Sequence, residues 1–127
     1  MSTINTIQFH HQEHRDWISS LDFYHDQIHI FQKELEKVLF EFPDLYSIIE
    51  HVDEYQKILF KKLSQVSHFR RQIILHERHL ADNSSFNEED LWGHMETREK
   101  LDEFIVNFEE LKKNFRGFVS KHLHAPN

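Results

Sequence analysis

Apolar side chains recur at alternating spacings of three and four residues through nearly the whole chain, in three separate runs. This spacing keeps one stripe of a helix facing its neighbours, so the pattern predicts long helices packed lengthwise in a bundle. The first run is His10, His14, Trp17, Leu21, Tyr24, Ile28, Phe31, Leu35, Val38 and Phe42. The second is Leu45, Ile48, Val52, Tyr55, Leu59, Lys62, Val66, Phe69, Ile73, His76 and Leu80. The third is His94, Thr97, Leu101, Phe104, Phe108, Leu111, Phe115, Phe118 and His122.

These runs predict an all-α fold, an antiparallel up-down-up bundle of three long helices over about 8–42, 44–81 and 86–121. Pro43 ends the first helix, because proline disfavours helical geometry in the residue before it. The second run contains no glycine or proline, so we expect one continuous helix. Ser85-Phe86-Asn87-Glu88 fits the capping box that starts a helix. Both connections are short, which makes sequential neighbours antiparallel.

The length of 127 residues predicts a single domain, 1–127. We expect the N-terminal segment 1–8 and the C-terminal tail 122–127 to be loosely held. Twelve phenylalanines supply a large apolar mass for the core, and two glycines and two prolines fit a structure with few turns. Gly117 is expected to be a weak point inside the third helix.

Charge and composition exclude several functional classes. A formal charge of −7 opposes nucleic-acid binding, which depends on attraction to phosphate. No apolar run approaches the roughly 18–20 residues that span a bilayer, so no membrane partner is expected. The absence of cysteine excludes disulfides and thiolate chemistry. The first residues lack a basic region followed by an apolar one, and a cytoplasmic location is therefore expected.

Histidines occupy inward positions at one shared end of the predicted bundle. The two turns centre near residues 43–44 and 85, so His76 should lie level with residues near 11 and near 94. His10 and His14, one turn apart on one helix face, should then point toward His76 and His94. Glutamates and an aspartate stand at similar height: Glu13, Glu77 and Asp90.

This arrangement predicts a candidate transition-metal site. Neutral imidazole suits zinc, iron, copper or nickel, and carboxylates complete the ligand set or orient the imidazoles. The candidate ligands are His10, His14, His76, His94, Glu77 and Asp90.

Ordinary polar packing at a partly wet bundle end is the competing interpretation. Two of seven heptad positions face inward, so twelve scattered histidines would place about three or four there, against five in this chain. Sharper motifs are missing. The Glu-x-x-His pairs of di-iron bundles do not occur, and Asp22-x-x-His25 and Asp26-x-x-His29, which have similar spacing, fall mainly on the outer face. His76-Glu77-Arg78-His79 is one residue short of the zinc-protease pattern.

The sequence leaves two functions open. The first is a small soluble helical protein without enzymatic activity that acts through a protein partner or as a homodimer. It is favoured by apolar residues off the inward stripe, such as Phe23 with Ile30 and Phe60 with Ile74, and by the lack of a nucleophile–base pair or glycine-rich loop. The alternative is a transition-metal-binding bundle that uses the histidine cluster.

Overall fold

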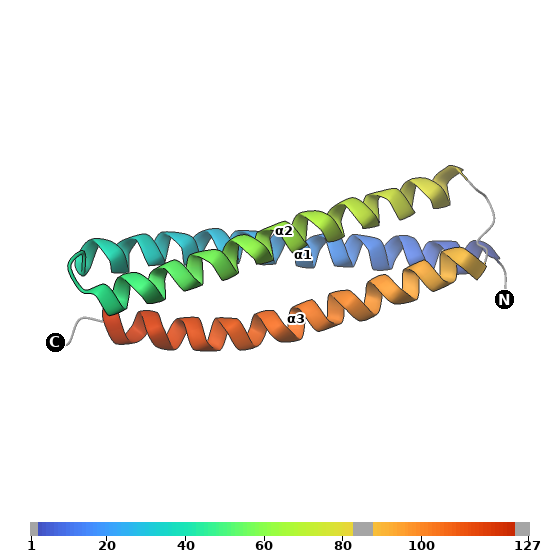
Figure 1. The fold of residues 1–127 in the computed structure, drawn as a ribbon. Coiled ribbons are helices and arrows are strands. Elements are labelled where there is room, and N and C mark those ends of the chain that lie inside the picture. The colour runs from blue at the N-terminus through green and yellow to red at the C-terminus, as the bar shows by residue number, and fades with distance from the viewer. Residues whose placement is uncertain (1–2, 83–87, 124–127) are drawn as a thin grey trace.

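The computed structural model describes residues 3–82 and 88–123, with side chains over 8–80 and 93–122. Three long helices account for nearly all of this part: α1 (Thr3–Glu41), α2 (Tyr46–Asp82) and α3 (Glu88–Leu123). The helices lie lengthwise beside one another, and the turn between α1 and α2 is at the same end as the end of α3 (Figure 1). The predicted antiparallel bundle of three helices is confirmed.

The helix ends differ from the prediction by a few residues. Helix α1 starts at Thr3 instead of near residue 8, because no glycine or proline interrupts the chain before His10, where the heptad run begins. Helix α3 continues to Leu123 rather than 121. Most of the predicted capping box, 85–87, lies outside the described residues.

Helix α2 also begins later than expected, because the chain first makes a tight turn after Pro43. The backbone N–H of Leu45 donates to the carbonyl of Phe42, and the N–H of Ile49 donates to the carbonyl of Leu45. Leu45, which we predicted to point inward, is 50% exposed in this turn. The inward stripe of α2 therefore begins at Ile48.

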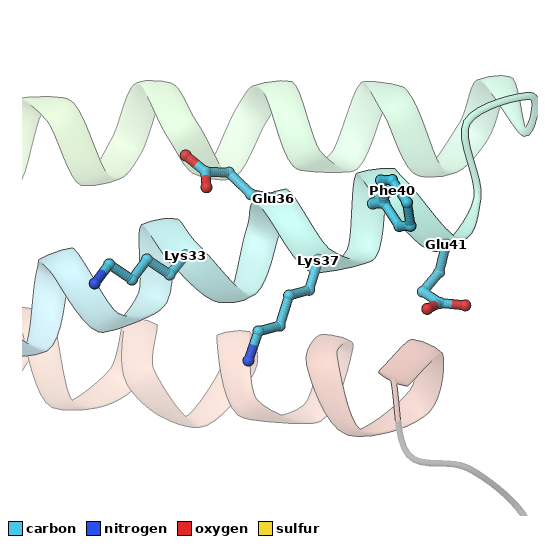
Figure 2. A pocket seen from close by; sticks show the side chains of 5 residues that line it. All are labelled: Lys33, Glu36, Lys37, Phe40 and Glu41. Atoms are coloured by element: carbon cyan, nitrogen blue, oxygen red, sulfur yellow. The ribbon is translucent and has the colours of Figure 1, made fainter.

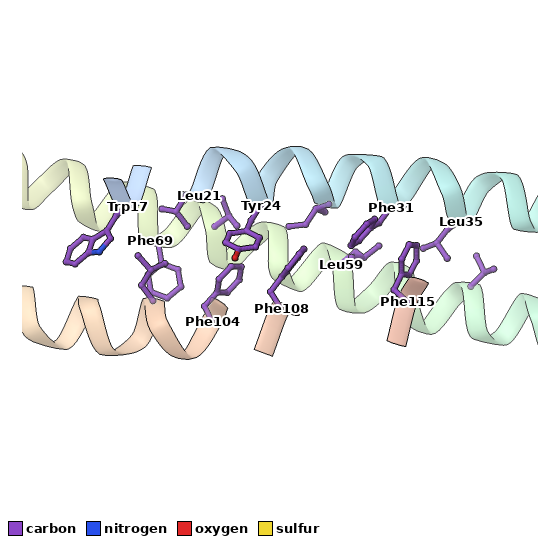
Figure 3. Packing of buried hydrophobic residues seen from close by; sticks show 14 of the residues in the cluster. Trp17, Leu21, Tyr24, Phe31, Leu35, Leu59, Phe69, Phe104, Phe108 and Phe115 are labelled. Atoms are coloured by element: carbon purple, nitrogen blue, oxygen red, sulfur yellow. The ribbon is translucent and has the colours of Figure 1, made fainter. Parts of the chain in front are cut away.

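The remaining inward positions are buried or half-buried, as the heptad pattern predicts. Aliphatic side chains dominate between α1 and α2, where Leu21, Leu35 and Leu59 are fully buried. Helix α3 contributes mainly phenylalanines, and Phe31 of α1 stacks against Phe115 with ring centroids 4.5 Å apart (Figure 3). The backbones of α1 and α3 lie farther apart than those of α1 and α2, because large rings fill the space between α1 and α3.

Polar members of the central core have structural partners. The hydroxyl of Tyr24 donates to Glu109 on α3 at 3.2 Å. The ammonium of Lys62 lies 5.4 Å from the centre of the Phe104 ring, a favourable cation–π position, and burial lowers its pKa. No helix in the described ranges has an apolar stretch that could span a membrane.

Gly117 offers a test of the helical packing, because α3 runs through it without interruption. A side-chain carbon added there would meet no atom within 4 Å. We predict that Gly117→Ala raises the free energy of unfolding by about 0.5–1 kcal/mol, through the lower backbone entropy of unfolded alanine. Urea unfolding followed by circular dichroism measures this, with the surface substitution Lys113→Ala as the control. A loss of stability in Gly117→Ala would mean that α3 is locally distorted at this position.

Candidate metal centre

The buried stripe of each helix becomes polar at one end of the bundle, where α1 and α3 begin and α2 ends. His10, His14 and His94 are only 2–4% exposed, because they continue the inward positions of the apolar core. His76 is half-buried on α2. We call the residues that meet here the histidine end: His10, His11, Glu13, His14, Trp17, His76, Glu77, His94 and Arg98.

An inner group joins α1 to α3. The imidazoles of His10 and His94 meet edge to face, with ring centres 3.8 Å apart. Oxygen Oε1 of Glu13 lies 2.6 Å from Nε2 of His94 and 3.9 Å from Nδ1 of His10. One potential ligand atom from each of these three residues lies within 4.8 Å of the other two. Two nitrogens and a carboxylate oxygen are thus close enough to converge on one ion.

Arg98 fixes the carboxylate of Glu13. Its Nε donates to Oε2 and its Nη2 to Oε1, both at 2.7 Å, in the two-point geometry typical of arginine with carboxylate. Burial alone raises the pKa of Glu13, but the hydrogen bonds from Arg98 and His94 outweigh it and hold the pKa below its usual value. Glu13 is therefore an ionised acceptor, oriented from α3 although it belongs to α1.

An outer group joins α1 to α2 through Glu77. Its carboxylate lies 2.6 Å from Nδ1 of His11 and 2.7 Å from Nδ1 of His14. Since an ionised carboxylate only accepts, both Nδ1 atoms act as donors. In neutral His14 the lone pair then belongs to Nε2, which is buried and makes no hydrogen bond within the described part of the chain. The His14 ring is centred 5.0 Å from that of His94.

Neighbouring groups hold the imidazoles in place. Trp17 stacks on His94, with ring centres 4.7 Å apart and planes 29° from parallel. His76 packs beside Gly93, where a side-chain carbon would make an ordinary contact with its Nε2 at 3.5 Å. Thr97 turns its hydroxyl back to the carbonyl of Gly93 at 2.9 Å, so it does not compete for the histidines.

Burial keeps the inner histidines neutral. Desolvation is the main cause that lowers the pKa of His94, to about 4, against the opposing effect of its hydrogen bond to Glu13. Desolvation also lowers the pKa of His10. Near neutral pH both rings are unprotonated, which is the state that binds a metal.

The structure brings together some of the predicted ligands. His10 and His94 converge in the inner group, and the His14 ring is centred 5.0 Å from that of His94. Glu77 bonds to His14 rather than lying in the inner group. His76 is centred 6.2 Å from His14 and stands outside the inner group. The side chain of Asp90 lies outside the described residues. Whether a metal binds stays a prediction.

Two further residues of the cluster were not among the predicted ligands. Glu13 was noted at the right height but not assigned to the site, and Arg98 was not singled out. A signal was present for both: Glu13 follows His10 by three residues and Arg98 follows His94 by four, which places each pair on one helix face.

Comparison with known proteins gives no relative from which a function could be carried over: no protein-family model, curated protein or solved structure matches the chain.

The lowered pKa of His94 predicts a stability that falls on acidification of the metal-free protein. Between the unfolded value of 6.5 and the folded value of about 4, the unfolded chain binds a proton that the native state does not. The part of the free energy of unfolding that depends on a neutral His94 is fully present above pH 6.5. It is lost progressively toward pH 4, by up to about 1.4 kcal/mol per pH unit. Urea unfolding in EDTA from pH 7.5 to 4.5 should show a shallower slope in His94→Gln than in the unmodified protein.

His68→Gln serves as the control, since His68 is exposed and lies eight residues, about two helical turns, before His76 on α2. Equal pH slopes for the unmodified protein and His94→Gln would contradict the burial of a neutral His94.

Proposed function

We propose that this chain is a transition-metal-binding protein that holds one ion at the histidine end. The ligands are His10, Glu13 and His94, with Nε2 of His14 as the fourth. The convergence of His10, Glu13 and His94, with ligand atoms within 4.8 Å of one another, is the observation that carries the proposal. The buried Nε2 of His14, which lacks a hydrogen-bond partner in the described part of the chain, supports it independently.

The donor set favours a borderline metal ion. Three imidazole nitrogens and one carboxylate oxygen suit zinc, copper, iron or nickel better than magnesium or calcium, which prefer oxygen ligands. Ligand atoms around four-coordinate zinc lie about 3.4 Å apart. The ligand atoms of the inner group lie within 4.8 Å of one another, so side-chain movements of roughly an ångström would bring them onto one ion.

Metal binding at this site requires a tautomer change in His94. In the metal-free protein Nε2 of His94 donates its proton to the ionised Glu13, 2.6 Å away. An ion held by both atoms needs that proton on Nδ1 while the ring stays neutral, so affinity falls only at a pH low enough to protonate the imidazoles. Arg98 keeps Glu13 oriented and Glu77 keeps His14 in the ligating tautomer, the usual roles of groups that hydrogen-bond to metal ligands.

Sensing or storage of a metal, or redox chemistry at the ion, would each use this site. Enzymatic activity stays unassigned, and the cytoplasmic location stays an expectation from sequence.

Metal titration of untagged, EDTA-stripped protein tests the proposal directly. Isothermal titration with Zn²⁺ should give one tightly bound equivalent, and His10→Gln/His94→Gln should lower its affinity at least 100-fold. Glu77→Gln, which removes the charge that holds the Nδ1 protons of His11 and His14, should lower it about 10- to 100-fold. His68→Gln is the matched control and should bind as the unmodified protein does.

The metal-binding proposal is wrong if neither Zn²⁺ nor Cu²⁺, Ni²⁺ or Fe²⁺ binds at this end, or if His10→Gln/His94→Gln retains the affinity of the unmodified protein. Circular dichroism of each variant separates loss of the site from loss of the fold. Should the double variant fail to fold, Glu77→Gln alone decides, because it leaves all four proposed ligands in the chain.

Exposed apolar side chains favour a second candidate function, a protein that acts through contacts or self-association. Phe40 is 84% exposed beside a shallow surface hollow lined by charged residues of α1 (Figure 2). Phe60 and Ile74 lie in one column of α2, and both are exposed next to surface hollows. Contiguous patches of exposed apolar groups are typical of contact surfaces, and in this column Ser67 stands between the two side chains.

Sedimentation velocity over about 5–200 μM protein tests self-association, since dimers of modest interface area dissociate in this range. If α2 forms a dimer contact, the mass should approach twice that of one chain, and Phe60→Ser/Ile74→Ser should restore the monomer. Phe40→Ser, on α1, is the control. If the protein stays monomeric over this range, self-association is excluded, and contact with a different protein remains the second candidate function.

A further inference from the structure

A second pair of histidines lies on α1, away from the histidine end. His25 and His29 are one helical turn apart, and their ring centres are 4.5 Å from each other. Their Nε2 atoms face each other at 3.3 Å. His25 is 44% exposed at its side chain and His29 is exposed, so both rings are accessible to an ion in solution.

The distance between these nitrogens matches the geometry of a shared metal ligand pair. Zn–N bonds of about 2.0–2.1 Å at tetrahedral angles place two ligand nitrogens about 3.3–3.4 Å apart. The pair therefore needs little rearrangement to chelate an ion. Its backbone is held in place, because the neighbouring Tyr24 and Ile28 are both buried in the core.

Nearby charges also favour ligation. Nδ1 of His25 lies 3.6 Å from the carboxylate of Asp26, which places a negative charge beside the pair. Asp22, one turn earlier, is paired with Arg70. The formal charge of −7 adds a general attraction for cations.

We propose that His25 and His29 form a separate, exposed metal-binding site, a two-imidazole chelate for zinc or copper(II) whose remaining positions are filled by water. Within the described residues no third histidine, aspartate or glutamate joins the pair in a close ligand group. His25 is about 22 Å along α1 from His10, at 1.5 Å per residue, so the two sites hold different ions. The proposal does not depend on the histidine end.

Copper(II) is the probe, because it binds nitrogen ligands most tightly among the divalent first-row metals. The test protein carries His10→Gln/His94→Gln, which removes the two inner histidines. With histidine rings labelled with ¹⁵N, substoichiometric Cu²⁺ should broaden the His25 and His29 signals before any other. Titration should show one equivalent bound at this pair, and His25→Gln or His29→Gln should each weaken it at least 10-fold.

His29→Gln/Ile30→His is the matched control, since it keeps the number of histidines but moves one ring about 100° around the helix. It should bind as weakly as His29→Gln alone. Equal broadening of all exposed histidines, unchanged affinity in His25→Gln, or recovery of binding in the control would each overturn the proposal. Failure at the histidine end would leave these results unaffected, because two of its ligands, His10 and His94, are absent from the test protein. If His10→Gln/His94→Gln does not fold, the same variants are compared in the unmodified chain by the His25 and His29 signals.

Discussion

Continuous apolar packing along all three helices sets their axial register, and the polar cluster depends on that register. Tyr24 reaches Glu109, 85 residues later, in the middle of the bundle. Glu13 reaches Arg98 across the same sequence separation at its end. A slip of one helical turn between α1 and α3 would break both contacts. The stacked rings of Phe31 and Phe115 oppose such a slip, because large interlocked side chains fit in one position only.

Most of the fold could be predicted because the heptad signal is strong and almost uninterrupted. Inward positions from His14 to Val38 on α1 are all buried, and two short turns determine which residues lie level. Leu45 is predicted to point inward but is exposed, and the cause is local. Residues after Pro43 that periodicity alone assigns to a helix form the turn instead. Periodicity also carries no information before His10, so it could not place the start of α1 at Thr3.

Less of the candidate site could be predicted, since height in a bundle does not specify which polar atoms meet. His10, His14 and His94 were expected to share one level, and they do. The division into two groups depends on side-chain reach: Glu77 extends across to α1, whereas His76 stays beside Gly93. Arg98 could have been found by asking which cation neutralises a half-buried Glu13, a question of charge that hydrophobic periodicity does not raise.

The salt bridge between Arg98 and Glu13 constrains how this sequence can change over evolution. Replacing Arg98 alone leaves a carboxylate without its counter-charge, and replacing Glu13 alone removes the acceptor shared by Arg98 and His94. Arg98 is 39% exposed and Glu13 18%, so solvent reduces these costs, but only exchange of the whole set leaves no charge unpaired. We therefore expect homologous chains to keep these three residues together or to have lost them together, with few intermediate combinations.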